Sequence, residues 1–357
     1  MTNASSAGEL RIGVVGCGGS RQTFGPALAR LHGACPAAFM DVDIIPARLW
    51  AKQARGARAY CDFDEFVAES DTHAVIVASP PDVRAHHVAQ LLRAGKHVLA
   101  ETPMAPTASI GLELCDLARR SGLVLLPALP LRYEPALTEA EQRVRAGSIG
   151  EVRELRCEWA YSSAWSERKA IFGSWPAALL RHSIRTLDVA RRMLGEAHAV
   201  SADIDRAGSH RRGGNLANLI VQHDRGVSVH HIHRTSRRAR FEQYVLTGTV
   251  GMLELAAPAA GALDGSSVFF LSARSAGSHN HETSGPFCDP EGSDRTDCAI
   301  DRLLADFVRT ALGNASPRVT GYDAVAAQAV FEAALVSSAE GLKLTVTAPA
   351  RAAIAAV

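Results

Sequence analysis

Lysine is scarce in this sequence. Among 357 residues only Lys52, Lys96, Lys169 and Lys343 are lysines, against 34 arginines. Few amines are therefore available as catalytic acids or bases, while guanidinium groups, which stay protonated near neutral pH, are abundant. Net charge is lacking as well: the formal value is +1, which gives no general reason to bind nucleic acid or a membrane surface.

Patterns typical of metal sites, disulfides and membrane spans are also missing. The seven cysteines never form a C-x-x-C pair, so neither a zinc site nor a disulfide framework is expected. No apolar run reaches the ~20 residues of a membrane span, and residues 1–9 lack the apolar core of a signal peptide. We therefore expect a cytoplasmic protein, long enough for two domains of about 150 residues each.

The first third of the chain alternates short apolar runs with helical stretches. The expected strands are Leu10–Val15, Ala37–Val42, Ala74–Ala78, His97–Ala100 and Leu123–Leu126; helices are expected from the glycine turn to His32 and over Ala47–Ala54, Phe63–Glu69, Val83–Ala94 and Ile110–Arg120. Parallel strands need helical crossovers, and this alternation supplies them. It predicts an α/β domain over residues 1–128 with a doubly wound, parallel Rossmann sheet.

Beyond Pro130 the pattern changes to strands at meander spacing. The expected strands are Glu151–Tyr161, Ala197–Ile204, Leu216–His223, Val227–His233, Phe241–Thr247, Met252–Leu255 and Val268–Leu271, with helices at Pro135–Arg145, Ala177–Leu194, Asp297–Leu312 and Asp323–Leu342. Ser275–Asp294 is rich in turn formers and is expected to be a loop. Residues 129–357 thus predict a second α/β domain with a large, open, mostly antiparallel sheet.

A glycine-rich turn follows the first predicted strand. Gly16 allows a tight turn, Gly18 lets backbone N–H groups approach a pyrophosphate, and the following helix N-terminus adds a positive dipole. The third glycine of the G-x-G-x-x-G pattern is replaced by Arg21. Asp41, at the end of the second strand, stands where a carboxylate binds the adenosine ribose. The motif predicts a dinucleotide site; the alternative is a glycine turn without a ligand.

The residues around Asp41 favour NAD over NADP. Asp43 follows two residues later and no basic residue is adjacent, so a 2′-phosphate would meet negative charge. Arg21 and Arg48 are the groups that could weaken this preference.

Several further segments resemble one family. They are Ser79-Pro80-Pro81, the stretch from Ala94 through Glu101-Thr102-Pro103, Leu131-Arg132-Tyr133-Glu134-Pro135, residues 146–152, the helix segment Leu187–Gly195, and the segment from Phe241 to Gly251. Together they resemble the glucose–fructose oxidoreductase / inositol dehydrogenase family, along nearly the whole chain.

The resemblance implies a Rossmann domain, a second domain whose open sheet forms a homodimer or homotetramer, and NAD-dependent hydride transfer on sugars or cyclitols. It also implies roles for individual residues. Gly16, Gly18, Gly19, Ser20 and Arg21 would line the pyrophosphate, Asp41 would bind the ribose, Ser79, Pro80 and Pro81 would flank the dinucleotide, and Glu101 would lie near the nicotinamide ribose.

The sequence departs from the family at its reactive residues. The family keeps a lysine after the glutamate, then an aspartate and a histidine four residues apart on the second-domain helix. Here these positions are Thr102, Arg181 and Arg185. The family's histidine after the proline pair is likewise Arg84.

Arg181 and Arg185 share one helix face with Asp188, at spacings of four and three residues. Guanidinium groups are poor general bases but bind carboxylates and phosphates well, so this face predicts an anion-binding site. Alternatively, Arg185 pairs with Asp188, and Arg181 with other carboxylates or solvent.

Other side chains near this helix are candidates for proton transfer. His182 lies one residue off the reactive face, with an ordinary pKa suited to that role; a packing histidine is the alternative. Tyr161 and Lys169 precede the helix without a motif of their own. We therefore name Thr102, Arg181, His182 and Arg185 as the candidate reactive residues.

No metal site is expected. His231 and His233 alternate to one face of a strand and His230 to the other, which favours histidines of a sheet face over a metal pair. His279, His281, Cys288 and Cys298 lie in or after the irregular loop without a telling spacing.

The residues favour an NAD(H)-dependent oxidoreductase acting on an anionic, sugar-like or cyclic small molecule, for example a nucleotide sugar, in a secondary-metabolite pathway. Two alternatives stay open. One is reduction of a C=N or conjugated bond, where substrate or water supplies the proton that a lysine would otherwise give. The other is a non-catalytic, dinucleotide-dependent regulator or a protein that works beside a partner enzyme.

Overall fold

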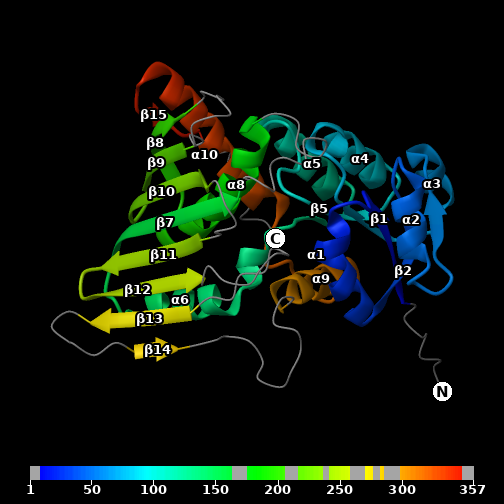
Figure 1. Cartoon of the computed structure of the whole chain (residues 1–357), viewed down its shortest axis with the longest axis horizontal. Helices are drawn as coiled ribbons and strands as arrows, with labels where there is room; N and C mark the ends of the chain where they lie inside the picture. Colours follow the sequence, from blue (N-terminus) through cyan, green and yellow to red (C-terminus); the bar gives the residue numbers. More distant parts are fainter. Residues whose placement is uncertain are drawn as a thin grey trace. The chain divides into compact units, whose positions relative to one another are not determined.

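The computed structural model describes residues 9–162, 175–205, 216–235, 241–257, 270–275, 282–284 and 298–347. These residues form two compact units (Figure 1). The first comprises residues up to Met104, Glu113–Ala128 and Ile300–Gly321; the second comprises Ala105–Leu112, Leu129–Ala299 and the chain from Tyr322. The segment Ile300–Gly321 returns to the first unit, which a single division at residue 128 does not describe.

The first unit contains the predicted parallel sheet. Its order is β3-β2-β1-β4-β5-β6, and the paired strands run parallel throughout. The strands are β1 (Leu10–Val15), β2 (Ala34–Met40), β3 (Arg58–Tyr60), β4 (Ala74–Val77), β5 (His97–Ala100) and β6 (Leu125–Pro127). Every residue of β4 is buried, as expected of a strand covered on both faces.

Helices connect these strands and cover the sheet. They are α1 (Ser20–Arg30), α2 (Ile44–Ala51), α3 (Phe63–Glu69), α4 (Pro81–Arg93) and α5 (Ala108–Arg120). Asp43 caps α2 by accepting from the N–H of Ile45, and Asp62 caps α3 by accepting from that of Glu65. These caps explain why both helices begin where the sequence turns from strand to polar residues.

Helix α9 (Cys298–Ala311) comes from far along the sequence. Arg30 at the end of α1 donates to both carboxylate oxygens of Asp301 at 3.0 and 3.1 Å. Leu303, Leu304 and Phe307 are fully buried. The segment Ile300–Gly321 therefore completes the first unit.

The second unit is built on a nine-stranded sheet of order β14-β13-β12-β11-β7-β10-β9-β8-β15. Its pairs are antiparallel except β7 with β10, which run parallel. The strands are β7 (Val152–Ser162), β8 (Ala197–Ile204), β9 (Leu216–His223), β10 (Gly226–Thr235), β11 (Phe241–Gly248), β12 (Gly251–Ala257), β13 (Phe270–Ser275), β14 (Glu282–Ser284) and β15 (Leu344–Thr345). The predicted mostly antiparallel sheet is confirmed.

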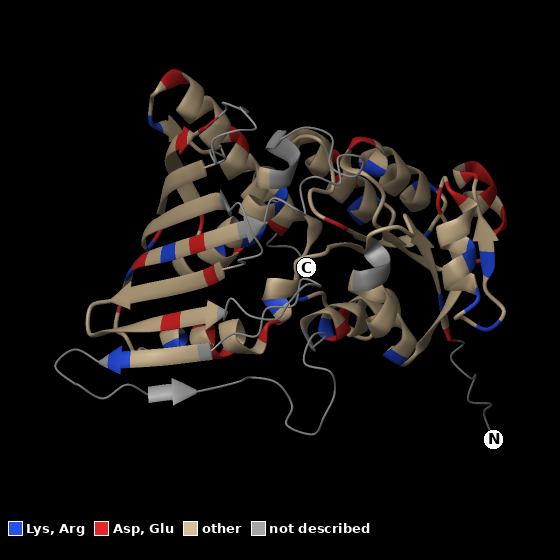
Figure 2. Cartoon of the chain, in the orientation of Figure 1, with Lys and Arg blue, Asp and Glu red and all other residues tan. Residues whose placement is uncertain are grey.

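One face of this sheet carries the core, and on β7 the opposite face carries charges. On β7 the buried side chains of Leu155, Cys157 and Trp159 alternate with Glu154, Arg156 and Glu158 (Figure 2). Helix α8 (Trp175–Leu194) contacts β7 and β10, and α6 (Pro135–Arg145) contacts β12 and β13. The 3-10 helix η1 (Pro130–Tyr133) and α10 (Gly321–Glu340) complete the unit.

The structure corrects several predicted boundaries. The expected loop over Ser275–Asp294 is wrong at Glu282–Ser284, which form β14 on β13. This strand has only three residues, which is too short for an apolar alternation to mark it. The short strands β3 and β15 were missed for the same reason, and β2 begins at Ala34 because that residue already pairs with Leu10.

Candidate functional site

Gly16 closes β1 in a conformation that only glycine adopts easily. Its φ is +92°, and an added Cβ would lie 2.6 Å from the backbone of Ala78 and Ser79. Its N–H donates to the carbonyl of Met40 at 2.8 Å. The turn is therefore fixed between β2 and the end of β4.

Gly18 and Gly19 are glycines for a different reason. An added Cβ would meet nothing within 4 Å at either position, and both residues are exposed. They precede α1, whose first turn has no acidic residue, so open space lies above an uncompensated helix N-terminus. This cradle fits a pyrophosphate. Ser20 and Arg21 begin α1, but their side chains lie outside the described residues.

Asp41 directly follows β2 and is held by two backbone N–H groups. Oδ2 accepts from Cys17 at 2.7 Å and Oδ1 from Asp43 at 3.1 Å. Each oxygen keeps further lone pairs, so the carboxylate can still accept from a ribose hydroxyl. Val42 and Ile45 beside it are 86% and 62% exposed, an apolar flank at the same place.

The segments after β4 and β5 lie next along the same edge of the sheet. Ser79 is buried and its Oγ lies 3.0 Å from Nδ1 of His87. Pro80 and Pro81 form the start of α4, and Glu101 N–H donates to Val77 at 2.9 Å. Burial, with His86 and Arg84 adding to it, lowers the pKa of His87 to about 4.

Thr102 leaves a buried polar atom without a hydrogen bond. The residue is 1% exposed, and Oγ1 has no partner among the residues that the structure describes. An unmade bond of this kind costs free energy. The hydroxyl is therefore suited to a bond with a group outside the described residues, such as a bound ligand.

The predicted cofactor residues thus share one edge of the first unit. Because the strand order is β2-β1-β4-β5, the carboxyl ends of these strands place Asp41, the glycine turn, Ser79 and Glu101 in that sequence along the edge. Ligands of doubly wound sheets bind at this edge, where the strand order reverses between β1 and β4. The arrangement suits one extended dinucleotide.

Helix α8 of the second unit carries the other predicted residues. Arg181 and Arg185 are half-buried, while His182 is 4% exposed and packs edge-on against Trp159, with ring centroids 3.6 Å apart. Burial raises the pKa of Tyr244 on β11, Glu242 adds to the shift, and the Arg185 charge opposes it. The side chain of Tyr161, and Lys169 as a whole, lie outside the described residues.

Asp188 pairs with Arg132, a residue not named as a candidate above. Nε and Nη2 of Arg132 donate to its two oxygens, each at 2.6 Å, and Nη2 also contacts Asp323 at 3.1 Å. Burial disfavours the guanidinium charge, but Asp188 and Asp323 outweigh this and raise the pKa of Arg132. An Arg185–Asp188 pair is the alternative expected from the sequence. In the structure, Arg132 binds both carboxylate oxygens of Asp188.

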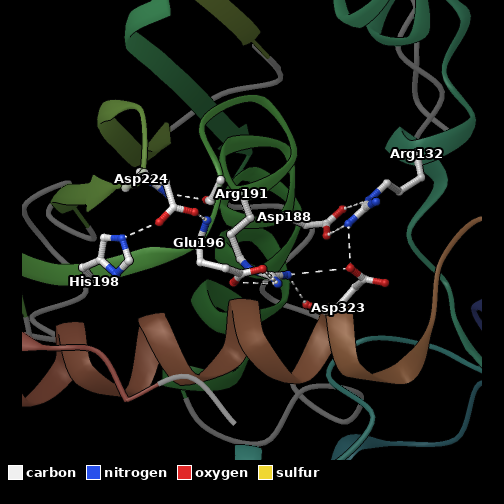
Figure 3. A network of polar contacts seen from close by, with 9 residues as sticks. Arg132, Asp188, Arg191, Glu196, His198, Asp224 and Asp323 are labelled. Carbon is white, nitrogen blue, oxygen red and sulfur yellow. Dashed lines mark hydrogen bonds and ion pairs between the residues drawn. The ribbon is translucent and has the colours of Figure 1, made fainter. Parts of the chain in front are cut away.

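The ion pair is part of a wider polar network that joins η1, α8 and α10 (Figure 3). Arg191 pairs with Glu196 at 2.8 Å and donates to the carbonyl of Asp323 at 3.0 Å. At the other end Asp224 accepts from Glu196 N–H at 2.8 Å and contacts His198. The sequence did not predict the part of this network around Arg132, because Asp188 and Asp323 lie 56 and 191 residues from it.

A second polar chain runs between β10 and α8. His223 Nδ1 lies 3.0 Å from the Gly195 carbonyl, and Nε2 lies 2.8 Å from Ser228 Oγ. That oxygen lies 2.8 Å from His230 Nε2, whose Nδ1 lies 3.1 Å from Thr186 Oγ1. Burial lowers the pKa of His230 to about 3. The ring is neutral and ties the sheet to the helix.

Metal ligation finds no support in the described ranges. They contain no group of three histidine, cysteine or acidic side chains placed for a metal ion. His231 and His233 do share a face, with rings 5.2 Å apart, while His230 points to α8. His279, His281 and Cys288 lie outside the described residues, as does the side chain of Cys298.

Among the residues that the structure describes, no helix has the length and apolar character to cross a membrane.

Comparison with known proteins agrees with both units. Residues 10–129 match a model described as an oxidoreductase family with an NAD-binding Rossmann fold, and residues 137–254 match a GFO/IDH/MocA C-terminal domain. A dTDP-3,4-didehydro-2,6-dideoxy-alpha-D-glucose 3-reductase of Streptomyces violaceoruber is 37% identical over 147 residues, 41% of this chain and 43% of the relative. The matches span about half the length of the curated relatives.

Solved structures resemble nearly the whole chain. An oxidoreductase from Agrobacterium radiobacter, in complex with NAD+, L-tartaric acid and magnesium, has a TM-score of 0.80 at 18% identity and covers 95% of this chain and 99% of its own. A WlbA dehydrogenase from Chromobacterium violaceum, with NADH and UDP-GlcNAcA, has a TM-score of 0.77 at 16% identity, covering 97% and 98%. At these identities the likeness shows the fold.

Proposed function

The chain belongs to the GFO/IDH/MocA family of oxidoreductases, and we propose that it transfers a hydride between NAD(H) and an anionic, sugar-like substrate such as a nucleotide sugar. NAD(H), when bound, accepts or donates the hydride. The chain's own residues bind the dinucleotide, hold the substrate and exclude water. The homo-oligomer and the partner enzyme suggested by the sequence stay predictions.

The cofactor half of the proposal is supported by the edge of the first unit. The open space above Gly18 and Gly19 takes the pyrophosphate, and Asp41, already oriented by two N–H groups, accepts from the adenosine ribose. Asp43 adds a second carboxylate there. A 2′-phosphate would meet both negative charges, so NAD(H) is the cofactor we propose rather than NADP(H).

The substrate half is carried by Arg181 and Arg185. They occupy the helix positions where the family keeps an aspartate and a histidine, and both remain partly exposed on α8. Two guanidinium groups one helical turn apart suit a carboxylate or phosphate. Two similar proteins are named for, or bound to, nucleotide sugars, which are anions of this kind.

The experiment is substrate-analogue binding to single alanine variants. Each charge-assisted contact contributes about 1.5–3 kcal/mol, so Arg181→Ala and Arg185→Ala should each weaken binding of UDP or dTDP sugars roughly ten- to a hundredfold. NADH affinity should stay unchanged. Arg156→Ala, an exposed arginine on β7, is the matched control. Lower melting temperatures with intact sugar affinity would assign both arginines to the scaffold.

Turnover separates the enzyme from the alternatives. Nicotinamide fluorescence measures the oxidation of bound NADH. Oxidation on adding keto sugars supports the proposal. Oxidation only with imines or conjugated substrates would favour the other reductase class. Tight sugar and NADH binding with no oxidation would favour a dinucleotide-dependent binding protein.

A further inference from the structure

Arg84 is a buried charged residue that the proposed function does not use. It lies in the first turns of α4 and is 3% exposed. Arginine is almost never buried to this degree unless its hydrogen-bonding groups are engaged. The burial of Arg84 therefore indicates that its guanidinium is bonded to other parts of the protein.

Its guanidinium connects two segments at the carboxyl edge of the sheet. Nη2 donates to the carbonyl of Ser79 at 2.5 Å, and Nη1 donates to the carbonyl of Pro103 at 2.6 Å. The first segment follows β4 and the second follows β5. One planar side chain thus bridges the two segments, and its charge strengthens both hydrogen bonds.

The direction of the dinucleotide follows from the strand order. Asp41 holds the adenosine half at the end of β2, and the pyrophosphate lies at the glycine turn after β1. The nicotinamide half then extends over the ends of β4 and β5, on the other side of the switch point. Ser79, Glu101 and Thr102 stand at those ends.

We propose that Arg84 is the positioning residue of the nicotinamide end: it ties the Ser79 and Pro103 segments together and places a fixed positive charge behind Thr102. The guanidinium binds the carbonyl of Pro103, the residue after Thr102, and Thr102 is the position where the family keeps its lysine. The proposal rests on the cofactor site alone and is independent of the anionic substrate.

The fixed charge has a measurable consequence. The oxidised nicotinamide ring is a cation and the reduced ring is neutral, so a buried guanidinium nearby disfavours the oxidised form. Removing the charge should therefore strengthen NAD+ binding relative to NADH binding. A residue that only stabilises the fold would change both affinities alike.

The test compares three ligands on Arg84→Met and Arg84→Lys. ADP-ribose, which lacks nicotinamide, should bind both variants as it binds the unmutated protein. In Arg84→Met, NADH should weaken roughly tenfold through loss of the two bonds, and the ratio of the NAD+ to the NADH Kd should fall about threefold or more. Arg84→Lys keeps the charge but cannot bridge both carbonyls, so it should weaken both forms and preserve the ratio. Arg93→Met, exposed at the end of α4, is the control.

Two results would overturn the proposal. One is an Arg84→Met protein that binds ADP-ribose normally and shows unchanged NAD+ and NADH affinities. The other, decisive even if the methionine variant fails to fold, is an Arg84→Lys protein with both affinities equal to those of the unmutated chain. Neither result bears on Arg181 and Arg185, whose test uses sugar binding.

Discussion

Asp41 shows how one residue sets cofactor choice. Its carboxylate is fixed by the N–H groups of Cys17 and Asp43 before any ligand arrives, so little ordering is required on binding. The residue is therefore prepared to accept from a ribose hydroxyl and to repel a phosphate.

Asp41→Ala should erase most of the preference for NADH over NADPH, because the repulsion disappears with the carboxylate. Calorimetry with both cofactors on the variant and the unmutated protein measures this. Asp62→Ala is the matched control: it removes the α3 cap at a cost of about 1 kcal/mol of stability but should keep the preference. Equal affinities in the unmutated protein would contradict the prediction.

Thr102 is where a lysine would be introduced to restore the family pattern. We expect Thr102→Lys not to oxidise inositol or glucose, because Arg181 and Arg185 still replace the acid and the histidine. The new amine would also lie in a buried place beside the Arg84 charge, which lowers a lysine pKa. NADH production with either polyol is the measurement, and strong turnover would mean that the pocket is an ordinary one.

Residues differ in how far the sequence reveals them. The spacing of Gly16 and Asp41 is local and predicts their roles, because strand, turn and helix follow one another directly. Arg132 and Arg84 escape such reasoning, because Asp188, Asp323 and the Pro103 carbonyl are distant from them in sequence. Whether an arginine binds substrate or bridges elements depends on burial, which the residue type does not encode.

At the scale of elements, polar connections hold α8 on several sides. Asp188 ties it to η1, and Thr186 ties it to β10. The helix that carries the proposed anion site is thus anchored on both sides. Its periodicity predicted the helix, whereas these anchors depend on the packing of the unit.

Removing one partner of the Arg132–Asp188 pair should lower the free energy of unfolding strongly. Arg132→Met leaves a carboxylate that is 1% exposed without its bidentate partner, which should lower the free energy of unfolding by about 3–5 kcal/mol. Urea denaturation measures this. The double variant Arg132→Met with Asp188→Leu should recover part of the loss; an additive loss in the double variant would show that the two residues act separately.

The His223–Ser228–His230–Thr186 chain allows its hydrogens to be assigned. The Gly195 carbonyl only accepts, so His223 carries its hydrogen on Nδ1 and accepts at Nε2 from Ser228. Ser228 then accepts from His230 Nε2, and His230 Nδ1 accepts from Thr186, whose hydroxyl is shared with the Ser183 carbonyl. Every ring is used in its neutral form.

Acid should therefore weaken this unit. The pKa of His230 is about 3 in the folded chain and near 6.5 when unfolded, so below pH 6.5 the unfolded chain binds the extra proton. Stability falls as pH drops from about 6.5 to 3, by up to roughly 1.4 kcal/mol per pH unit for this group. His230→Gln should flatten the slope measured by denaturation at successive pH values, and exposed His32→Gln should not. An unchanged slope in His230→Gln would place the acid sensitivity elsewhere.

At the scale of the whole molecule, the first unit is assembled from separate parts of the chain. Alternation predicted its sheet well, since each crossover lies beside its strands. It did not predict that Ile300–Gly321 returns to this unit, because an amphipathic helix shows only that it has a partner and not which one. β14 escaped prediction for a different reason: its three residues are too few for an alternating pattern, although its partner β13 is the preceding strand.

A fragment ending at residue 128 should be markedly less stable than the unit within the full chain. It lacks α9, and so loses the Arg30–Asp301 pair and the burial of Leu303, Leu304 and Phe307. At about 1.5–3 kcal/mol per buried side chain, the loss is on the order of 5 kcal/mol. Joining residues 298–321 to the fragment through a flexible linker should raise its melting temperature and restore NADH binding. Equal melting temperatures with and without the added segment would mean that α9 contributes little.

Because α9 lies late in the sequence, the first unit also stays incomplete for part of translation. A ribosome adds about 5–20 residues per second, so Ile300 emerges roughly 10–30 s after Ala128. During that interval the nascent Rossmann sheet has its glycine turn and Asp41 but an uncovered apolar surface where α9 will pack. Strands β7–β14 of the second unit are translated meanwhile, and the first unit is completed only shortly before the chain from Tyr322 completes the second. Chaperones that shield apolar surfaces therefore have a long opportunity on the half of the protein that was made earliest.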